Sequence, residues 1–260
     1  MADLKILVLV KQTFTTEARI QLDAQGKIVD KGIKYVISPY DEYAVEKAIQ
    51  MQEAGGGIVR ILTVGSDKTL ETMRIALAMG AAEAVRVWDP CLETADSQIT
   101  AQVIAAAMKK VPFDLVLAGK AAVDDQSYEV PARVAGLLGL PLVNAITSLS
   151  VSGTTAKVER ETDAGKETIE VPLPAVLTAE KGLAEPRYPT LPNIMKAKKK
   201  PVQVYGLGDI GLSAAALKPA VQVLGLSTPA PRKGAAIIGG SPQEAVKELV
   251  RRLKEEAKVL

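Results

Sequence analysis

The chain has 260 residues, of which 48% are hydrophobic and 24% charged, values typical of one large globular domain or one domain with appendages. A net charge of +2 excludes a strong overall attraction to nucleic acid or membranes, and no apolar run approaches the ~18 residues of a membrane span. The absence of histidine excludes Ser-His-Asp and Cys-His nucleophiles and histidine-based metal sites. General acid–base work would fall to Asp, Glu, Lys or Tyr, and a bound cofactor would carry the chemistry of any catalysis.

The first half of the chain alternates short apolar runs with amphipathic segments. This alternation predicts a doubly wound, mostly parallel α/β sheet, in which ligands bind beyond the carboxyl ends of the strands. The predicted strands are 5–10, 58–64, 84–88 and 115–118, and the predicted helices are 41–55, 70–79, 95–110 and one between 125 and 140.

Several predicted strand ends and helix entrances converge on one crevice at that edge of the sheet. Residues 8–11 and 64–66 end two strands, and Ser38 and Pro39 are placed to cap and open a helix. The segment 118–131 follows a strand and opens another helix, with Ser127 as the expected N-cap. Free N–H groups there could bind a phosphate, although a plain connection capped by acidic residues explains the segment equally well.

The pattern changes after Pro141. Residues 145–178 contain β-rich segments, including a hairpin of 155–161 with 167–171, and we interpret them as antiparallel additions to the sheet. Residues 180–240 show no periodicity, which indicates an interaction arm. Ser241, Pro242 and Glu244 open a C-terminal helix with a capping box. The expected division is a nucleotide-binding domain at 1–180, an extended partner-binding arm at 181–240 and a helix at 241–260.

The stretch 185–201 combines three prolines with exposed-looking apolar residues and a lysine run. Such apolar side chains on a proline-braced loop indicate either a docking element or a surface loop that folds back on its own domain. The lysines suit a solvated flank better than a nucleic-acid patch. The single cysteine, Cys91, is expected to be a buried small hydrophobe, and it favours a reducing compartment.

These motifs resemble the β subunit of electron-transfer flavoprotein nearly from end to end. The similarity is carried by Ile6-Leu-Val-Leu-Val-Lys-Gln12, Ser38-Pro-Tyr-Asp-Glu-Tyr-Ala-Val-Glu46, Ile75-Ala-Leu-Ala-Met-Gly-Ala81, Gly119-Lys-Ala-Ala-Val-Asp-Asp125, Val158-Glu-Arg-Glu161, Leu173-Pro-Ala-Val-Leu-Thr178, Glu185-Pro-Arg-Tyr188 and Leu191-Pro-Asn-Ile-Met-Lys-Ala-Lys-Lys-Lys200.

The resemblance implies an electron carrier subunit, not an enzyme, that works as a heterodimer with an α subunit. FAD would lie mainly on the α subunit and a structural AMP in the crevice of this chain. Electrons would pass from acyl-CoA dehydrogenases toward a membrane quinone reductase. The implied nucleotide contacts are Leu9, Ser38, Pro39, Tyr40, Asp41, Val64, Gly119, Lys120, Ala121, Val123, Asp124, Asp125, Gln126, Ser127, Tyr128, Glu129 and Val130.

The resemblance also implies partner contacts. Leu191, with Pro192, Ile194 and Met195, would dock on the dehydrogenase, and Glu161 would lie near the mobile flavin domain of the α subunit. No secretory signal is evident. We expect a cytoplasmic protein if the source is bacterial or archaeal, and a protein of the mitochondrial matrix if it is eukaryotic.

The loop that begins at Gly119, which the resemblance implies contacts the nucleotide, departs from the family's usual sequence Gly-Lys-Gln-Ala-Ile-Asp-Asp-Asp. Ala121 and Gln126 replace a glutamine and an aspartate, and Glu129 stands where a glutamine is expected. Glu129 would disfavour a phosphate unless it points away or is paired. Two alternatives stay open: a bifurcating electron-transfer flavoprotein with a second FAD in place of AMP, and a stand-alone adenine-nucleotide sensor.

Overall fold

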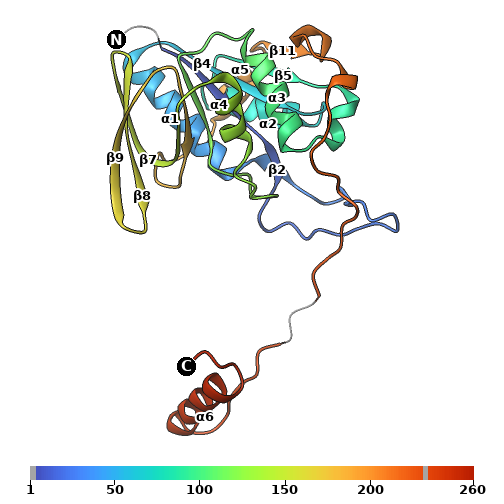
Figure 1. The fold of residues 1–260 in the computed structure, drawn as a ribbon, viewed down its shortest axis with the longest axis vertical. Helices are drawn as coiled ribbons and strands as arrows, with labels where there is room; N and C mark the ends of the chain where they lie inside the picture. Colours follow the sequence, from blue (N-terminus) through green and yellow to red (C-terminus); the bar gives the residue numbers. More distant parts are fainter. Residues whose placement is uncertain (1–3, 231–233) are drawn as a thin grey trace.

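The computed structural model describes residues 4–230 and 234–260, and its central feature is a nine-stranded sheet of order β11-β5-β4-β1-β6-β10-β7-β8-β9 (Figure 1). Six neighbouring strands run parallel, and β7 joins them by a parallel pairing with β10. The parallel core consists of β1 (Lys5–Leu9), β4 (Ile58–Val64), β5 (Glu83–Val87), β6 (Leu115–Gly119), β10 (Ala175–Ala179) and β11 (Val202–Tyr205).

Helices cover both faces of this sheet, which confirms the predicted doubly wound α/β fold. Strand side chains point alternately to the two faces. Ile6 and Val8 therefore pack with α1 (Pro39–Gly55) and α2 (Thr69–Met79), whereas Leu7 and Leu9 pack with α3 (Ser97–Met108) and α4 (Val130–Leu138). Such two-sided burial explains why β1 is a continuous apolar run.

The predicted antiparallel addition is confirmed for three strands: β7 (Leu142–Ser152), β8 (Thr155–Thr162) and β9 (Gly165–Pro172). The interpretation was wrong for β10, which pairs parallel with both β6 and β7 in the middle of the sheet. All five of its residues are buried, so β10 belongs to the core. A separate two-stranded sheet joins β2 (Gln12–Phe14) to β3 (Tyr35–Ile37).

The segment 180–240 contains regular elements that its sequence pattern did not predict. Leu191–Ala197 forms the short helix α5, so the expected docking loop is helical, and β11 follows as an edge strand of the main sheet. Long-range hydrogen bonds hold this connection. The Arg74 guanidinium donates to the carbonyls of Ala197 and Lys200, each at 2.7 Å. The Lys200 amine donates to the carbonyl of Leu77 in the last turn of α2 and to that of Ala81 just after it. Short 3₁₀ turns at Pro90–Thr94, Gly208–Ile210 and Ala214–Ala216 complete the connections.

The C-terminal helix α6 (Pro242–Glu255) confirms the predicted capping box. The Ser241 hydroxyl accepts from the Glu244 N–H, and the Glu244 carboxylate accepts from the Ser241 N–H. In Figure 1, α6 stands away from the sheet at the end of an extended segment. Its apolar side chains, among them Val246 and Val250, are exposed.

Two local predictions were wrong. Helix α4 begins at Val130 with Glu129 at the N-cap, so Ser127 is not its cap. Cys91 is exposed because it lies in a surface 3₁₀ turn whose inward-facing residue is Leu92. Ser38 does occupy the N-cap position of α1, but its side chain makes no capping hydrogen bond.

Candidate functional site

A cleft of about 630 Å³ lies at the carboxyl ends of β1, β4 and β6, where the parallel-sheet rule places ligands. Its floor comes from strand residues such as Leu9, Leu62 and Ala118, and its walls come from the starts of α3 and α4 and from the segment 119–129. The volume falls within the range of ~300–1,000 Å³ that small-molecule sites occupy. The cleft is therefore large enough for a mononucleotide, and we refer to it as the carboxyl-edge cleft.

The buried carboxylate of Asp41, in the first turn of α1, joins two strand ends at the base of this cleft. It accepts the backbone N–H of Lys11 after β1 and the backbone N–H of Gly119 in β6, both at 2.7 Å. These two bonds fix the start of α1 against the sheet. The contact requires an acceptor on both side-chain atoms: an amide such as that of asparagine would turn its NH₂ group toward one of the two backbone N–H groups.

Burial raises the pKa of Asp41 to about 7, although the two backbone N–H bonds favour the ionised form. The folded chain then binds more protons at this carboxyl than the unfolded chain does between about pH 4 and 7. Its contribution to the free energy of unfolding should fall as pH rises through that window and level off above it. A carboxyl ¹³C NMR titration should give Asp41 a midpoint near pH 7; a midpoint below about pH 5 would contradict the burial argument.

Gly119 permits the close contact between β6 and α1. A Cβ atom at this position would lie 2.6 Å from Oδ1 of Asp41 and 2.7 Å from its backbone nitrogen. The need for glycine here is thus a packing requirement between two elements of the fold.

The segment 120–129 closes one wall of the cleft and is held by ion pairs. The Lys11 amine, at the end of β1, contacts the carboxylates of Asp124 and Asp125 at 2.8 and 2.9 Å. Gln126 and Tyr128 have φ values of 48° and 60°, a left-handed conformation that side chains other than glycine seldom adopt. Such a tightly turned segment points backbone N–H groups in directions that a helix or strand would not allow.

Lys120 is not free to act as a simple phosphate ligand. Its amine is paired with Glu180 and lies 4.9 Å from the ring centre of Tyr40 and 5.9 Å from that of Tyr128. Burial lowers the pKa of Lys120, but the hydrogen bond to Glu180 and the electrostatic effect of Glu180 and the two tyrosines together raise it above its usual value. The cation is therefore fixed between two rings and a carboxylate.

The charge of Glu129 is compensated within the chain. Its carboxylate accepts hydrogen bonds from the Ser97 hydroxyl and from the Arg133 guanidinium, the latter at 2.8 Å. These two bonds lower the pKa of Glu129. We expected Glu129 to tolerate a nearby phosphate only if it pointed away or its carboxylate was paired. Its hydrogen bonds to Ser97 and Arg133 provide that pairing.

The predicted nucleotide contacts divide into two groups in the structure. Those that line the carboxyl-edge cleft are Leu9, Asp41, Val64, Gly119, Lys120, Ala121, Asp125, Ser127, Tyr128, Glu129 and Val130. The others adjoin it without lining it in the described chain: Ser38, Pro39 and Tyr40 at the start of α1, and Val123, Asp124 and Gln126 in the segment 120–129.

Sequence reasoning missed the wall formed by the start of α3. Asp96 caps this helix by accepting the Ile99 N–H at 2.8 Å, and its second oxygen accepts the N–H groups of Ala220 and Val221 at 2.6 and 3.1 Å. Asp96 and Val221 therefore bring the C-terminal arm to the rim of the cleft. An Asp before an apolar periodic segment is an N-cap signal, but the partner 125 residues away has no sequence signature.

The predicted docking residues form an exposed face on α5. Leu191 is 79% exposed and Met195 61%, while Ala197 is buried against α2. Ile194 and Pro192 are also exposed, and Glu161 is exposed near the end of β8. The helix leaves these side chains without a partner in the described chain.

Arg187 anchors the segment that leads to α5, a role that the sequence analysis did not assign. Its guanidinium donates to the buried Glu46 carboxylate at 2.9 Å and also pairs with Glu53, so that two turns of α1 hold it. Hydrogen bonding to Glu53 and Glu46 raises the pKa of Arg187 and keeps it charged. The docking segment is thereby fixed on the same helix that reaches the cleft through Asp41.

The residues that the structure describes contain no cluster of three or more His, Cys, Asp or Glu side chains placed to hold a metal ion. None of the helices in those residues has the length and apolarity needed to cross a membrane.

A doubly wound sheet with a ligand-sized cleft at its carboxyl edge defines the class of open α/β proteins whose ligand sites lie at that edge. The sequence model of the electron transfer flavoprotein domain matches residues 25–209. Proteins named electron transfer flavoprotein subunit beta are 44% identical in Syntrophomonas wolfei, over 99% of this chain and 98% of that protein, and 41% identical in Bacillus subtilis, over 99% and 100%. The human protein of that name is 37% identical over the full length of both chains.

The chain belongs to the electron transfer flavoprotein family, as a relative of its beta subunits. The family resemblance inferred from the motifs is therefore confirmed, and with it a place among the flavoproteins of electron transport.

Proposed function

We propose that this chain is the β subunit of a heterodimeric electron carrier that accepts electrons from acyl-CoA and related dehydrogenases and delivers them to a membrane quinone reductase. The observation that supports it best is the coexistence, on one family member, of a ligand-sized cleft and an exposed apolar helix. The FAD, when bound with the α subunit, would supply the redox chemistry. Residues of this chain would bind the nucleotide, help to position the flavin and recognise the redox partner.

AMP is the proposed occupant of the carboxyl-edge cleft. The cleft combines apolar side chains that could receive a purine, such as Trp88 and Ile104, with the hydroxyls of Ser66 and Thr69. The first turn of α4 offers N–H groups to one phosphate, whereas those of Gln126 and Ser127 are bonded within the segment 120–129. The carboxylate of Glu129 is already paired. Lys11 and Lys120 are both engaged by carboxylates, which favours a ligand with few phosphate charges.

Partner contacts are assigned to the arm at 181–240 and to Glu161, and nucleotide binding to the domain at 1–180, with the C-terminal helix at 241–260 as a separate element. Helix α5 would dock on the dehydrogenase, and the apolar face of α6 would pack on the α subunit. Val246, Leu249 and Val250 are 46–59% exposed, which is unusual for the apolar stripe of an amphipathic helix. A location in the bacterial or archaeal cytoplasm, or in the mitochondrial matrix of a eukaryote, suits this role.

Co-expression with the cognate α subunit tests the proposal. We expect a yellow heterodimer that releases one FAD and one AMP on acid denaturation, measured by chromatography. Two FAD and no AMP would instead identify a bifurcating carrier. A colourless homodimer that releases ATP would identify a nucleotide sensor, and either result would overturn the proposed function.

Replacement of Leu191 by alanine tests the docking helix. Because this side chain is 79% exposed, the fold and the bound flavin spectrum should not change. Loss of a central apolar anchor should lower kcat/KM for electron transfer from the dehydrogenase by at least about tenfold. Leu137→Ala, which removes a 53% exposed leucine from α4, is the matched control. Equal rates for the two variants would remove Leu191 from the interface.

A further inference from the structure

A second cavity lies at the opposite, amino end of the strands, in a part of the fold that the proposed function does not use. It has a volume of about 350 Å³ and lies between β4, β5, β11 and the turn after α3. Arg60, at this end of β4, is four residues from Val64 in the carboxyl-edge cleft, or about 13 Å along the strand. We call this cavity the amino-edge pocket, and the residues that define it here are Arg60, Val85, Lys110, Val111 and Tyr205.

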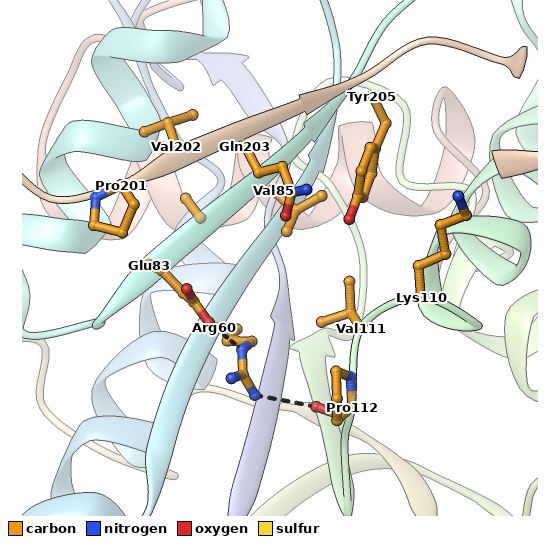
Figure 2. A pocket seen from close by; sticks show the side chains of 11 residues that line it. Arg60, Glu83, Val85, Lys110, Val111, Pro112, Pro201, Val202, Gln203 and Tyr205 are labelled. Carbon is orange, nitrogen blue, oxygen red and sulfur yellow. Dashed lines mark hydrogen bonds and ion pairs between the residues drawn. The ribbon is translucent and has the colours of Figure 1, made fainter. Parts of the chain in front are cut away.

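The pocket has a buried apolar floor and a polar rim. Val85 and Val111 are buried, whereas Lys110 and Gln203 are exposed. Figure 2 shows Tyr205 and Gln203 reaching into this space from β11, with Arg60 and Val111 on the opposite side and Lys110 beside Tyr205. A ligand would thus place an apolar body on the valines and a polar group at the rim.

Most of the side-chain groups at the rim that lack a hydrogen-bond partner can donate a hydrogen bond. In the parts of the chain that the structure describes, the Lys110 amine, the Tyr205 hydroxyl and the Gln203 amide make no hydrogen bond, and the amine lies 5.8 Å from the Tyr205 ring centre. The Glu83 carboxylate and the Pro112 carbonyl already accept hydrogen bonds from the Arg60 guanidinium, so the charged acceptor of the pocket is in use. Two cations and one carboxylate leave a net positive pocket.

These features select the chemistry of a ligand. The Arg60 side chain is only 18% exposed, and a partly desolvated cation attracts an anion strongly. The Glu83 carboxylate in the wall disfavours a dianion such as phosphate. A volume near the lower end of the range for ligand sites limits the size to roughly that of a substituted ring.

We propose that the amino-edge pocket binds a small organic monocarboxylate. Its carboxylate lies at the rim beside Lys110, within the field of Arg60, and its apolar body lies on Val85 and Val111. The Tyr205 hydroxyl and the Gln203 amide supply hydrogen bonds to the carboxylate. This site is independent of the carboxyl-edge cleft and of the flavin.

NMR titration of the ¹⁵N-labelled full chain with benzoate tests the proposal at constant ionic strength. We expect saturable shifts of the amides of β11 and of residues 110–112, with a dissociation constant of about 1 mM or lower. Benzyl alcohol, the neutral analogue, should bind roughly tenfold more weakly, because it lacks the charge-assisted hydrogen bond. Inorganic phosphate should produce no saturable shift there.

Lys110→Gln should weaken benzoate binding roughly tenfold, whereas Lys109→Gln, which removes the neighbouring exposed lysine outside the pocket, should bind as the native chain does. Both positions are exposed, so neither variant should unfold. The proposal is overturned if benzoate gives no saturable shift, if phosphate or benzyl alcohol binds as tightly, or if the two lysine variants behave alike.

Discussion

Replacement of Gly119 by alanine is expected to destabilise the chain by about 3 kcal/mol and to abolish the proposed nucleotide binding in the carboxyl-edge cleft. The added methyl group would lie 2.6–2.7 Å from the Asp41 carboxylate, the Asp41 nitrogen and the Tyr40 carbonyl carbon. Two of these three neighbours are backbone atoms, so no side-chain rotation can relieve the overlap. Helix α1 must shift away from β6, and the hydrogen bond from the Gly119 N–H to Asp41 must lengthen.

Urea denaturation followed by circular dichroism measures this loss, and the nucleotide content of the purified protein measures the effect on the cleft. Gly136→Ala is the matched control. Gly136 lies inside α4, and a Cβ atom there would meet nothing within 4 Å, so alanine should stabilise the chain by about 0.5–1 kcal/mol through helix propensity. A Gly119→Ala variant as stable as the native chain would show that α1 and β6 can separate at little cost.

Arg187→Met is expected to lower the free energy of unfolding by about 3 kcal/mol at pH 7. The variant leaves the Glu46 carboxylate, whose side chain is only 3% exposed, without its cationic partner. We place the effect at the lower end of the range for buried pairs because Arg187 itself is 34% exposed. The segment that carries Tyr188 and α5 should become mobile, since its main attachment to α1 is lost.

The pH dependence of this variant distinguishes an unpaired charge from a simple loss of packing. In the native chain Arg187 lowers the pKa of Glu46, so the ion pair contributes fully above the ordinary glutamate pKa and is lost as the pH falls below it. In the variant, burial favours protonation of Glu46, which removes the unpaired charge. The stability difference should therefore shrink as the pH falls from 7 toward 4.

Two further variants serve as controls for the Glu46 argument. Glu53→Gln alters only the exposed partner and should change stability by less than about 0.5 kcal/mol. Combining Glu46→Gln with Arg187→Met should restore much of the stability that Arg187→Met loses, because the buried charge is gone. No recovery in the double variant would indicate that contacts of the Arg187 side chain, and not the charge of Glu46, carry the effect.

Much of the fold and part of the candidate site followed from the sequence. Continuous apolar runs such as Ile6–Val10 and the periodic segment before Gly55 depend on local chemistry, so they predicted buried strands, helices and the edge at which a ligand would bind. The Ser241 capping box was predictable for the same reason, since its bonds join residues three positions apart. Short elements such as α5 and β11 were missed because long-range contacts, including those of Arg74 and Lys200, hold them.

By itself the sequence determined the α/β class, the family and the candidate loops, because strand and helix periodicity and family motifs are local properties of the chain. Only the tertiary structure decided how these parts combine. It joined Asp41 to two strand ends, paired Glu129 with Ser97 and Arg133, and fixed Arg187 on Glu46. Apart from Arg133, which lies four residues from Glu129, these partners come from distant parts of the chain. Burial and such long-range pairing depend on the packed arrangement, and no spacing along the chain specifies them.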